Sequence, residues 1–204
     1  VRLILDSRSN VHENVERNPN LLVRQRLRRA LQQNSSNHLV FIWPAFSDDF
    51  VAVDIVHDLN KIPYPFKDNV AEEIWMDNVL EHINNPMKVI EELHRIGKNK
   101  CIVNIAVPYF RSHYATIDPT HVNFFGVNYF NYFNPDHFFC TGYEYSSARF
   151  KTIKIEFDKE WHGNAGFFHN LLIKFANNYP EKYEARISHL FPLNSLRFTL
   201  EVLK

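Results

Sequence analysis

Short runs of apolar residues recur along the chain and predict the strands of a sheet. They lie at 1–5, 38–43, 51–56, 74–76 and 101–107, and each is bounded by polar or turn-forming residues. In the run 51–56, Val51, Val53 and Ile55 alternate with Ala52, Asp54 and Val56, whereas the runs 38–43 and 74–76 are candidates for buried strands.

A helix is predicted between the last two of these runs. Asn85 suits the N-cap and Pro86 suits the first helical position. The apolar positions that follow share one helical face: Met87, Val89, Ile90, Leu93 and Ile96. Gly97 is expected to end the helix in a left-handed conformation. Residues 51–108 thus alternate strand and helix, which predicts an α/β unit with a parallel sheet.

The C-terminal third has a different pattern. Residues 153–157 and 196–202 alternate apolar and polar side chains, which predicts two strands that pair antiparallel. Helices are predicted over 167–178 and 183–190, and a further helix over 21–33. The predicted fold class is α/β, with a Rossmann-like, mostly parallel sheet and an antiparallel C-terminal strand pair.

Length and composition favour a single globular domain over 1–204. The chain has 204 residues, 45% of them hydrophobic and 23% charged. Residues 1–50 are atypical and 51–204 carry the regular pattern.

The two cysteines form no disulfide framework, and no apolar run approaches the roughly 18 residues that span a bilayer. A cytoplasmic location is expected.

The charge balance argues against nucleic acid as a partner. Formal net charge is zero, so no global field attracts a polyanion. The arginines of the predicted helix 21–33 are read as its solvated face, with RNA contact as a weaker alternative. The histidines lack tight ligand spacing, which predicts no metal site. The sequence carries no signal for the oligomeric state.

Three segments resemble the class I S-adenosylmethionine (SAM) dependent methyltransferases of the family called type 11. Residues 58–69 contain Asp-Leu and then Ile-Pro-Tyr-Pro-Phe-Lys-Asp-Asn, similar to a D-L…L-P-F-x-D-N stretch. Residues 73–83 contain Val-Leu-Glu-His, and residues 92–97 read Glu-Leu-His-Arg-Ile-Gly, like the family's E-L-x-R-V-L-K-P-G-G. Their order and spacing match as well, over about three-quarters of the chain.

This resemblance implies SAM as the cofactor. It places Asp58 by the adenine amino group, residues 77–80 under the methionine end, and His82 in the cleft. The cofactor-binding residues it implies are Asp49, Asp58, Leu59, Asp77, Asn78, Leu80 and His82, with Asp49 as a stand-in for the acidic residue that holds the ribose. In the competing interpretation, Asp58 only caps a turn and His82 is a core histidine.

One family feature is missing. The first strand of such enzymes ends in a glycine-rich turn that lets the backbone approach SAM, but the first glycine of this chain is Gly97. Three explanations stay open. The loop has degenerated, a glycine-free loop binds SAM, or residues 1–50 are not the natural partner of the rest.

The loop after residue 108 holds the candidate chemistry on the acceptor side. Its words Asp-Pro-Thr-His and Asn-Phe-Phe are similar to a family segment that covers the substrate. A histidine titrates in the range of a general base, so His121 is the first candidate and His113 the second, with Asp118 to orient one of them. The competing interpretation makes Asp118 a turn residue and packs His121 on aromatic side chains.

Two functions follow from these residues. The first is a SAM-dependent methyltransferase that acts on a small-molecule or glycan-type methyl acceptor. The alternative is a catalytically inactive methyltransferase-like protein that serves as a binding or scaffold subunit, which the missing glycine-rich turn favours.

Overall fold

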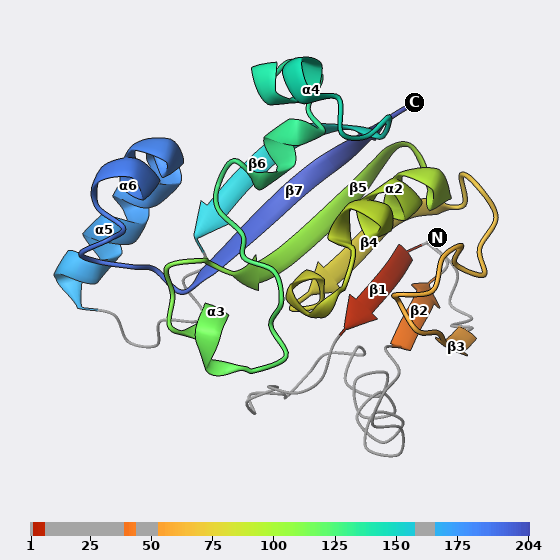
Figure 1. The fold of residues 1–204 in the computed structure, drawn as a ribbon, viewed down its shortest axis with the longest axis horizontal. Coiled ribbons are helices and arrows are strands. Elements are labelled where there is room, and N and C mark those ends of the chain that lie inside the picture. Colours follow the sequence, from red (N-terminus) through yellow and green to blue (C-terminus); the bar gives the residue numbers. More distant parts are fainter. Residues whose placement is uncertain (1, 7–38, 44–52, 158–165) are drawn as a thin grey trace.

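One sheet of seven strands organises the protein. The computed structural model describes residues 2–6, 39–43, 53–157 and 166–204, with side chains from residue 57 on. The strands are β1 (Arg2–Asp6), β2 (Leu39–Trp43), β3 (Val53–Val56), β4 (Ala71–Asp77), β5 (Gly97–Pro108), β6 (Arg149–Phe157) and β7 (Ser195–Leu203). Their order in the sheet is β3-β2-β1-β4-β5-β7-β6 (Figure 1).

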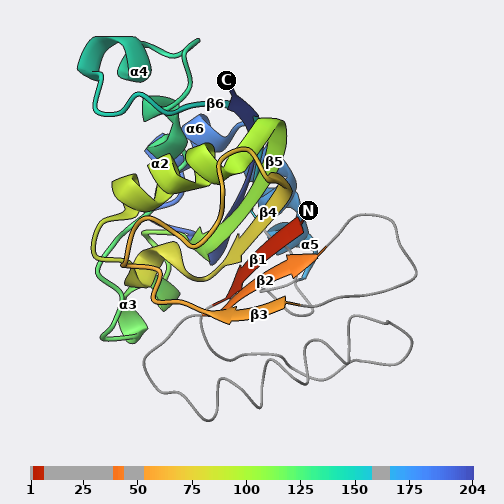
Figure 2. The same ribbon diagram turned by 90° about the vertical axis from the view of Figure 1, so that its right-hand side faces the viewer.

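Strand directions confirm the predicted fold class. β1 pairs parallel with β4, and β4 pairs parallel with β5. β7 lies between β5 and β6 and runs antiparallel to both, as the C-terminal alternation predicts. β2 runs antiparallel to β1 and to β3 (Figure 2). All the strands except β2 and β7 therefore point the same way.

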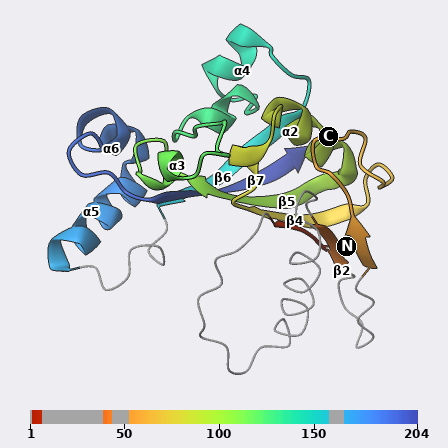
Figure 3. The ribbon, with the colours of Figure 1, turned by 60° about the horizontal axis from the view of Figure 1, so that its bottom comes forward.

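The helix predicted between β4 and β5 forms as α2 (Pro86–Ile96). The Asn85 side chain accepts a hydrogen bond from the Lys88 amide at 3.2 Å and caps its first turn. The predicted apolar face is buried, apart from Met87, which is partly buried. In Figure 3, α2 lies on one face of the sheet.

The prediction for Gly97 is wrong. Its φ of −69° and ψ of 138° are extended rather than left-handed, and β5 begins at this residue. A Cβ atom there would lie 3.0 Å from the Leu93 carbonyl oxygen and 3.0 Å from a methyl group of Val202. Glycine is needed here for close packing between helix and sheet, which a local sequence pattern does not reveal.

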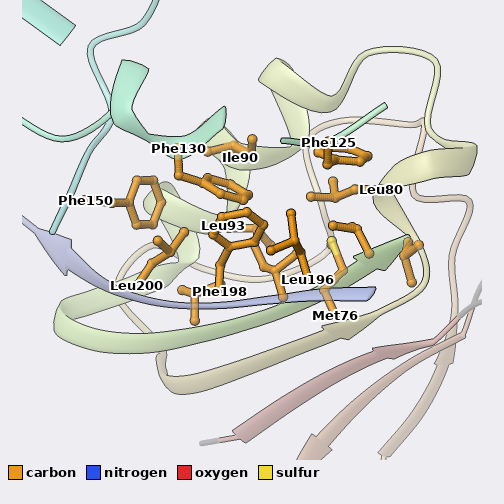
Figure 4. Close-up of a cluster of buried hydrophobic side chains, with 14 of the residues drawn as sticks. Met76, Leu80, Ile90, Leu93, Phe125, Phe130, Phe150, Leu196, Phe198 and Leu200 are labelled. Atoms are coloured by element: carbon orange, nitrogen blue, oxygen red, sulfur yellow. The ribbon is translucent and has the colours of Figure 1, made fainter. Parts of the chain in front are cut away.

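The main core lies between α2 and the sheet. Figure 4 shows Ile90 and Leu93 of α2 facing Phe198 and Leu200 of β7, with the aromatic ring of Phe130 above them. All of these side chains are at most 1% exposed. Burial of these apolar side chains is the main source of stability for the sheet.

The aromatic run between residues 124 and 139 contributes to this core. Phe125, Phe130 and Phe133 are buried, as large aromatic side chains of a globular protein usually are. Phe124 and Phe138 are 53% and 70% exposed, so the run is not core throughout.

Further helices complete the described part of the fold: η1 (Leu80–His82), α3 (Tyr114–Ile117), η2 (Tyr129–Tyr132), α4 (Phe138–Tyr143), α5 (Phe167–Asn178) and α6 (Pro180–Arg186). α5 has the predicted bounds. α6 begins before the predicted residue 183 because Pro180 suits a first turn, where its missing N–H is not needed. The predicted helix 21–33 lies outside the described residues. None of the helices that the structure describes is long and apolar enough to cross a membrane.

An ion pair within α2, between the buried Glu92 and the partly exposed Arg95, holds the segment that follows β3. Glu92 is 4% exposed, and its carboxylate accepts hydrogen bonds from the Tyr64 amide at 2.6 Å and from Arg95 at 2.6 and 2.9 Å. Arg95 also pairs with Asp68 at 2.5 Å. The position of the 58–69 segment therefore depends on Arg95.

Removing Arg95 is expected to destabilise the protein far more than removing an exposed lysine of the same helix. Arg95→Ala leaves the buried Glu92 carboxylate without its cation and should lower the free energy of unfolding by about 3 kcal/mol. Lys88→Ala breaks only an exposed pair with Glu91 and should cost less than about 0.5 kcal/mol. Urea denaturation of both variants measures the difference, and equal losses would contradict this account.

Candidate functional site

The carboxyl ends of β1 and β4 define the place where a ligand is expected. These neighbouring strands are parallel, and Asp6, the last residue of β1, is in register with Asp77, the last residue of β4. The chain leaves β1 and β4 for opposite halves of the sheet order, so a topological switch point lies between them. Sequence reasoning searched residues 1–50 for glycines and missed Asp6, although an acidic residue that ends an apolar strand was a visible signal.

The turn after β4 presents polar groups at this edge. Asn78 adopts a φ of 52°, which asparagine tolerates better than most residues, and its amide donates to the Ala106 carbonyl at 2.8 Å. The Asp77 side chain is 47% exposed and lies 3.7 Å from the Arg197 guanidinium of β7. Leu80 follows at 0% exposure, so it anchors the turn in the core.

The loop after α3 is fastened to this turn. The amides of Val122 and Asn123 both donate to the Glu81 carbonyl, at 2.8 and 3.2 Å. The Asn123 side-chain amide donates to the carbonyls of Leu80 at 3.0 Å and Ile83 at 2.5 Å. Figure 1 shows the segment that carries α3 at the edge where β1 and β5 end. Two segments far apart in sequence thus form one polar cluster.

Two histidines from these segments meet in the cluster. The rings of His82 and His121 lie 4.7 Å apart, nearly edge to face. The Thr120 hydroxyl donates to Asp118 at 2.6 Å and lies 2.9 Å from Nδ1 of His82. Because the hydroxyl proton goes to Asp118, the Thr120 oxygen accepts from His82 Nδ1–H.

The same tautomer follows for the second ring. His121 Nδ1 lies 3.2 Å from the Ala115 carbonyl, which only accepts. In the neutral form of each ring, Nε2 therefore carries the lone pair. Hydrogen bonds from Thr120 lower the pKa of the Asp118 carboxyl, and the nearby histidines lower it further.

Glu81 lies beneath the histidines. It is 2% exposed, and neither carboxylate oxygen has a hydrogen-bond partner among the residues that the structure describes. Burial raises the pKa of Glu81 to about 8, the charges of Asp118 and Asp77 raise it further, and the nearby backbone amide of Glu81 itself opposes them. Sequence analysis quoted this residue within a family word but assigned it no role, although its position next to His82 was a signal.

These three side chains have the composition of a metal-binding group. One nitrogen of His82, one nitrogen of His121 and a carboxylate oxygen of Glu81 all lie within 4.8 Å of one another. The prediction of no metal site considered only spacing along the chain. In the folded protein, Glu81 and His82 from one segment lie close to His121 from another, although these segments are far apart in the sequence.

The other predicted site residues lie in varied surroundings. Asp58 accepts from the Asn60 amide at 3.0 Å, so it caps a turn, and Leu59 is fully buried. His113 is exposed at the start of α3 and packs on Tyr114 with ring centroids 4.0 Å apart. Asp49 lies outside the described residues. The structure thus gathers Asp77, Asn78, Leu80, His82, Asp118 and His121, and it leaves His113 apart from that cluster.

An open cavity of about 490 Å³ lies elsewhere, between the end of β5 and α6. Phe110, Arg111, Glu181 and Glu184 are among its lining residues, and none of the cluster's residues is. The candidate site is therefore defined by its converging side chains rather than by this cavity.

No protein-family model matches the chain, and no curated protein matches it. One similar solved structure is a chain from the complex between the Haloferax volcanii Trm112 methyltransferase activator and a protein described as a methyltransferase. It has a TM-score of 0.44 and 17% identity over 72% of this chain and 60% of that chain. The cyclase SpnF has a TM-score of 0.40 and 16% identity over 72% and 54%.

A SAM-dependent methyltransferase from Archaeoglobus fulgidus has a TM-score of 0.34 and 22% identity over 67% of this chain and 61% of that chain. The chain thus spans less than two thirds of the length of each of these three proteins.

Asn123 is expected to hold the loop to the turn. Asn123→Ala removes both side-chain hydrogen bonds to the η1 region, leaves two carbonyls without them, and should lower the free energy of unfolding by about 1–3 kcal/mol. The amides of Val122 and Asn123 should also lose protection from hydrogen exchange. Asn84→Ala, at an exposed position nearby, should change stability by less than about 0.5 kcal/mol. Unchanged protection in Asn123→Ala would show that the loop is held in another way.

Proposed function

We propose that the protein is a SAM-dependent methyltransferase of the class I fold that methylates a small-molecule or glycan-type acceptor. The observation that carries this proposal is the meeting of the turn 77–82 with the loop 118–123 at the carboxyl edge of the sheet, next to the switch point between β1 and β4. Ligands of open α/β sheets bind at that place.

The donor half of the proposed site lies along this edge. Asp58 would accept from the adenine amino group, and Asp77 and Asn78 would lie by the methionine end of SAM. Leu59 and Leu80 are fully buried, so they would contribute through backbone atoms and through the shape of the turns. Asp49 remains the proposed ribose ligand, and His82 would close the site on the acceptor side.

The acceptor half would supply the base. SAM, when bound, would supply the methyl group to an acceptor hydroxyl oxygen and would leave as S-adenosylhomocysteine once its carbon–sulfur bond is broken. His121 Nε2 would take the hydroxyl proton, because its Nδ1 is already committed to the Ala115 carbonyl. Asp118 would orient His82 through Thr120, and His113 remains the second candidate base. Positioning of the two reactants supplies much of the rate enhancement in such a displacement.

Specific observations also favour the alternative of a catalytically inactive binding or scaffold protein. The chain has no glycine before Gly97, and Leu59 and Leu80 have no exposed surface to line a cleft. A protein that no longer binds SAM would keep this sheet and its edge loops as a platform for a partner.

Calorimetric titration with SAM and with S-adenosylhomocysteine separates the two functions. We expect both ligands to bind with one site per chain. Asp77→Ala should weaken SAM about tenfold, equivalent to about 1.4 kcal/mol, because it removes a carboxylate beside the sulfonium. Asp136→Ala, at an exposed position outside the site, should leave the affinity unchanged. No heat from either ligand at millimolar concentration would exclude the methyltransferase function and favour the scaffold.

A further inference from the structure

We propose that Glu81, His82 and His121 bind a divalent first-row transition-metal ion at the carboxyl edge of the sheet. One ligand atom from each residue lies within 4.8 Å of the others, so a small movement of the side chains would bring all three within the roughly 4.2 Å that two bonds of about 2.1 Å to one ion allow. The inference rests on these side chains and does not depend on methyl transfer.

The surroundings of Glu81 point to a cation. Its carboxylate is almost completely buried, and neither oxygen accepts a hydrogen bond from any residue that the structure describes. A buried carboxylate without a partner is costly, and such groups in proteins are usually paired with a charge or coordinate a metal. The neighbouring carboxylates Asp118 and Asp77 add negative charge, which also favours a cation.

Both histidines have the arrangement of oriented metal ligands. Metal-binding histidines typically donate one ring N–H to a carbonyl or carboxylate, which fixes the tautomer and turns the other nitrogen to the ion. His121 donates through Nδ1 to the Ala115 carbonyl, and His82 donates through Nδ1 to Thr120, which in turn donates to Asp118. In both rings Nε2 is then the coordinating atom.

The backbone holds the ligands in place before an ion binds. Glu81 and His82 belong to η1, and its Glu81 carbonyl accepts the amides of Val122 and Asn123, which directly follow His121. The two segments are thus joined within two residues of every proposed ligand. Little conformational entropy remains to be lost on binding, which raises the expected affinity.

The donor set indicates the class of ion. Two imidazoles and one carboxylate suit zinc, iron or cobalt, whereas magnesium and calcium prefer sites made of oxygen ligands. Three protein ligands leave at least one position for water or for an oxygen atom of a bound molecule. If the proposed methyltransferase function holds, the ion would take the Nε2 lone pair of His121, and the ion rather than His121 would then activate a hydroxyl or carboxylate oxygen of the acceptor bound at the open position.

Titration with Co²⁺ and Zn²⁺ in the absence of SAM tests the site. We expect one Co²⁺ per chain, with visible absorption bands that Zn²⁺ abolishes as it displaces cobalt. Zn²⁺ should also raise the thermal midpoint in a concentration-dependent way, because it binds only the folded chain. An equal concentration of Mg²⁺ should neither displace cobalt nor raise the midpoint.

Variants identify the ligands. Glu81→Gln and His121→Asn should each weaken Zn²⁺ at least about 100-fold, since even partners outside the coordination sphere contribute about 10–100-fold. His189→Asn removes an exposed histidine elsewhere and should bind Zn²⁺ like the unaltered chain. Far-UV circular dichroism shows whether each variant is folded, and His121→Asn, at a partly exposed position, carries the test if Glu81→Gln does not fold.

Two results would overturn the proposal: no stoichiometric Co²⁺ or Zn²⁺ binding by the unaltered chain, or equal Zn²⁺ affinity in His121→Asn and His189→Asn. The metal titrations contain no SAM, so their outcome is separate from that of the SAM titration. Metal binding without SAM binding would retain this site and exclude the methyltransferase function.

Discussion

Parallel pairing of β1, β4 and β5 determines where every candidate functional group lies. In register, Leu3 faces Ile74, and Ile74 faces Val103. Because the three strands run the same way, the chain leaves the sheet at one edge after Asp6, after Asp77 and after Pro108. The turn after β4 and the loop after β5 are therefore brought side by side, and a few hydrogen bonds suffice to join them. Without this parallel pairing, the segments that carry His82 and His121 would not be brought together.

The hydrogen bonds that join those segments also create an electrostatic conflict. The Glu81 carbonyl accepts hydrogen bonds from the loop amides, while the carboxylate of the same residue is almost completely buried. Burial of that carboxylate opposes its ionisation and raises its pKa to about 8. The rest of the structure tolerates this cost because the neighbouring Val79, Leu80 and Ile83 are fully buried and anchor the turn. Local conflicts of this kind occur most often at functional sites.

Much of the fold is visible in the sequence because its signals are local. The apolar runs mark the strands, the Asn85-Pro86 pair marks the start of α2, and α5 has the bounds that its apolar composition predicts. Strand direction cannot be read from such local signals, because an apolar run such as 38–43 is compatible with either direction. The antiparallel direction of β2 depends on the strands with which it pairs. Gly97 was misread for a similar reason, since its neighbour Val202 lies far along the chain.

Some residues of the candidate site could likewise be predicted from local sequence, and others could not. His82, Asp118 and His121 were named from family words, and they meet in the cluster. Glu81 was not named for a role, because an acidic residue in a turn is usually solvated, and its burial follows only from the folded structure. The prediction of no metal site rests on spacing along the chain, which gives no signal for ligands from two distant segments. Asp58 shows the opposite case, since its turn-capping contact follows directly from its local sequence.

The cluster also bears on the choice between an enzyme and an inactive scaffold. The hydrogen bonds that join its two segments, the turn after β4 and the loop after α3, lie within residues 77–123. A scaffold with no ligand at this edge would be more stable with an apolar side chain at position 81, because replacement of a buried charge by a well-packed apolar group is often neutral or stabilising. In the proposed metal site, a divalent cation would compensate the Glu81 carboxylate, whose charged form burial otherwise disfavours.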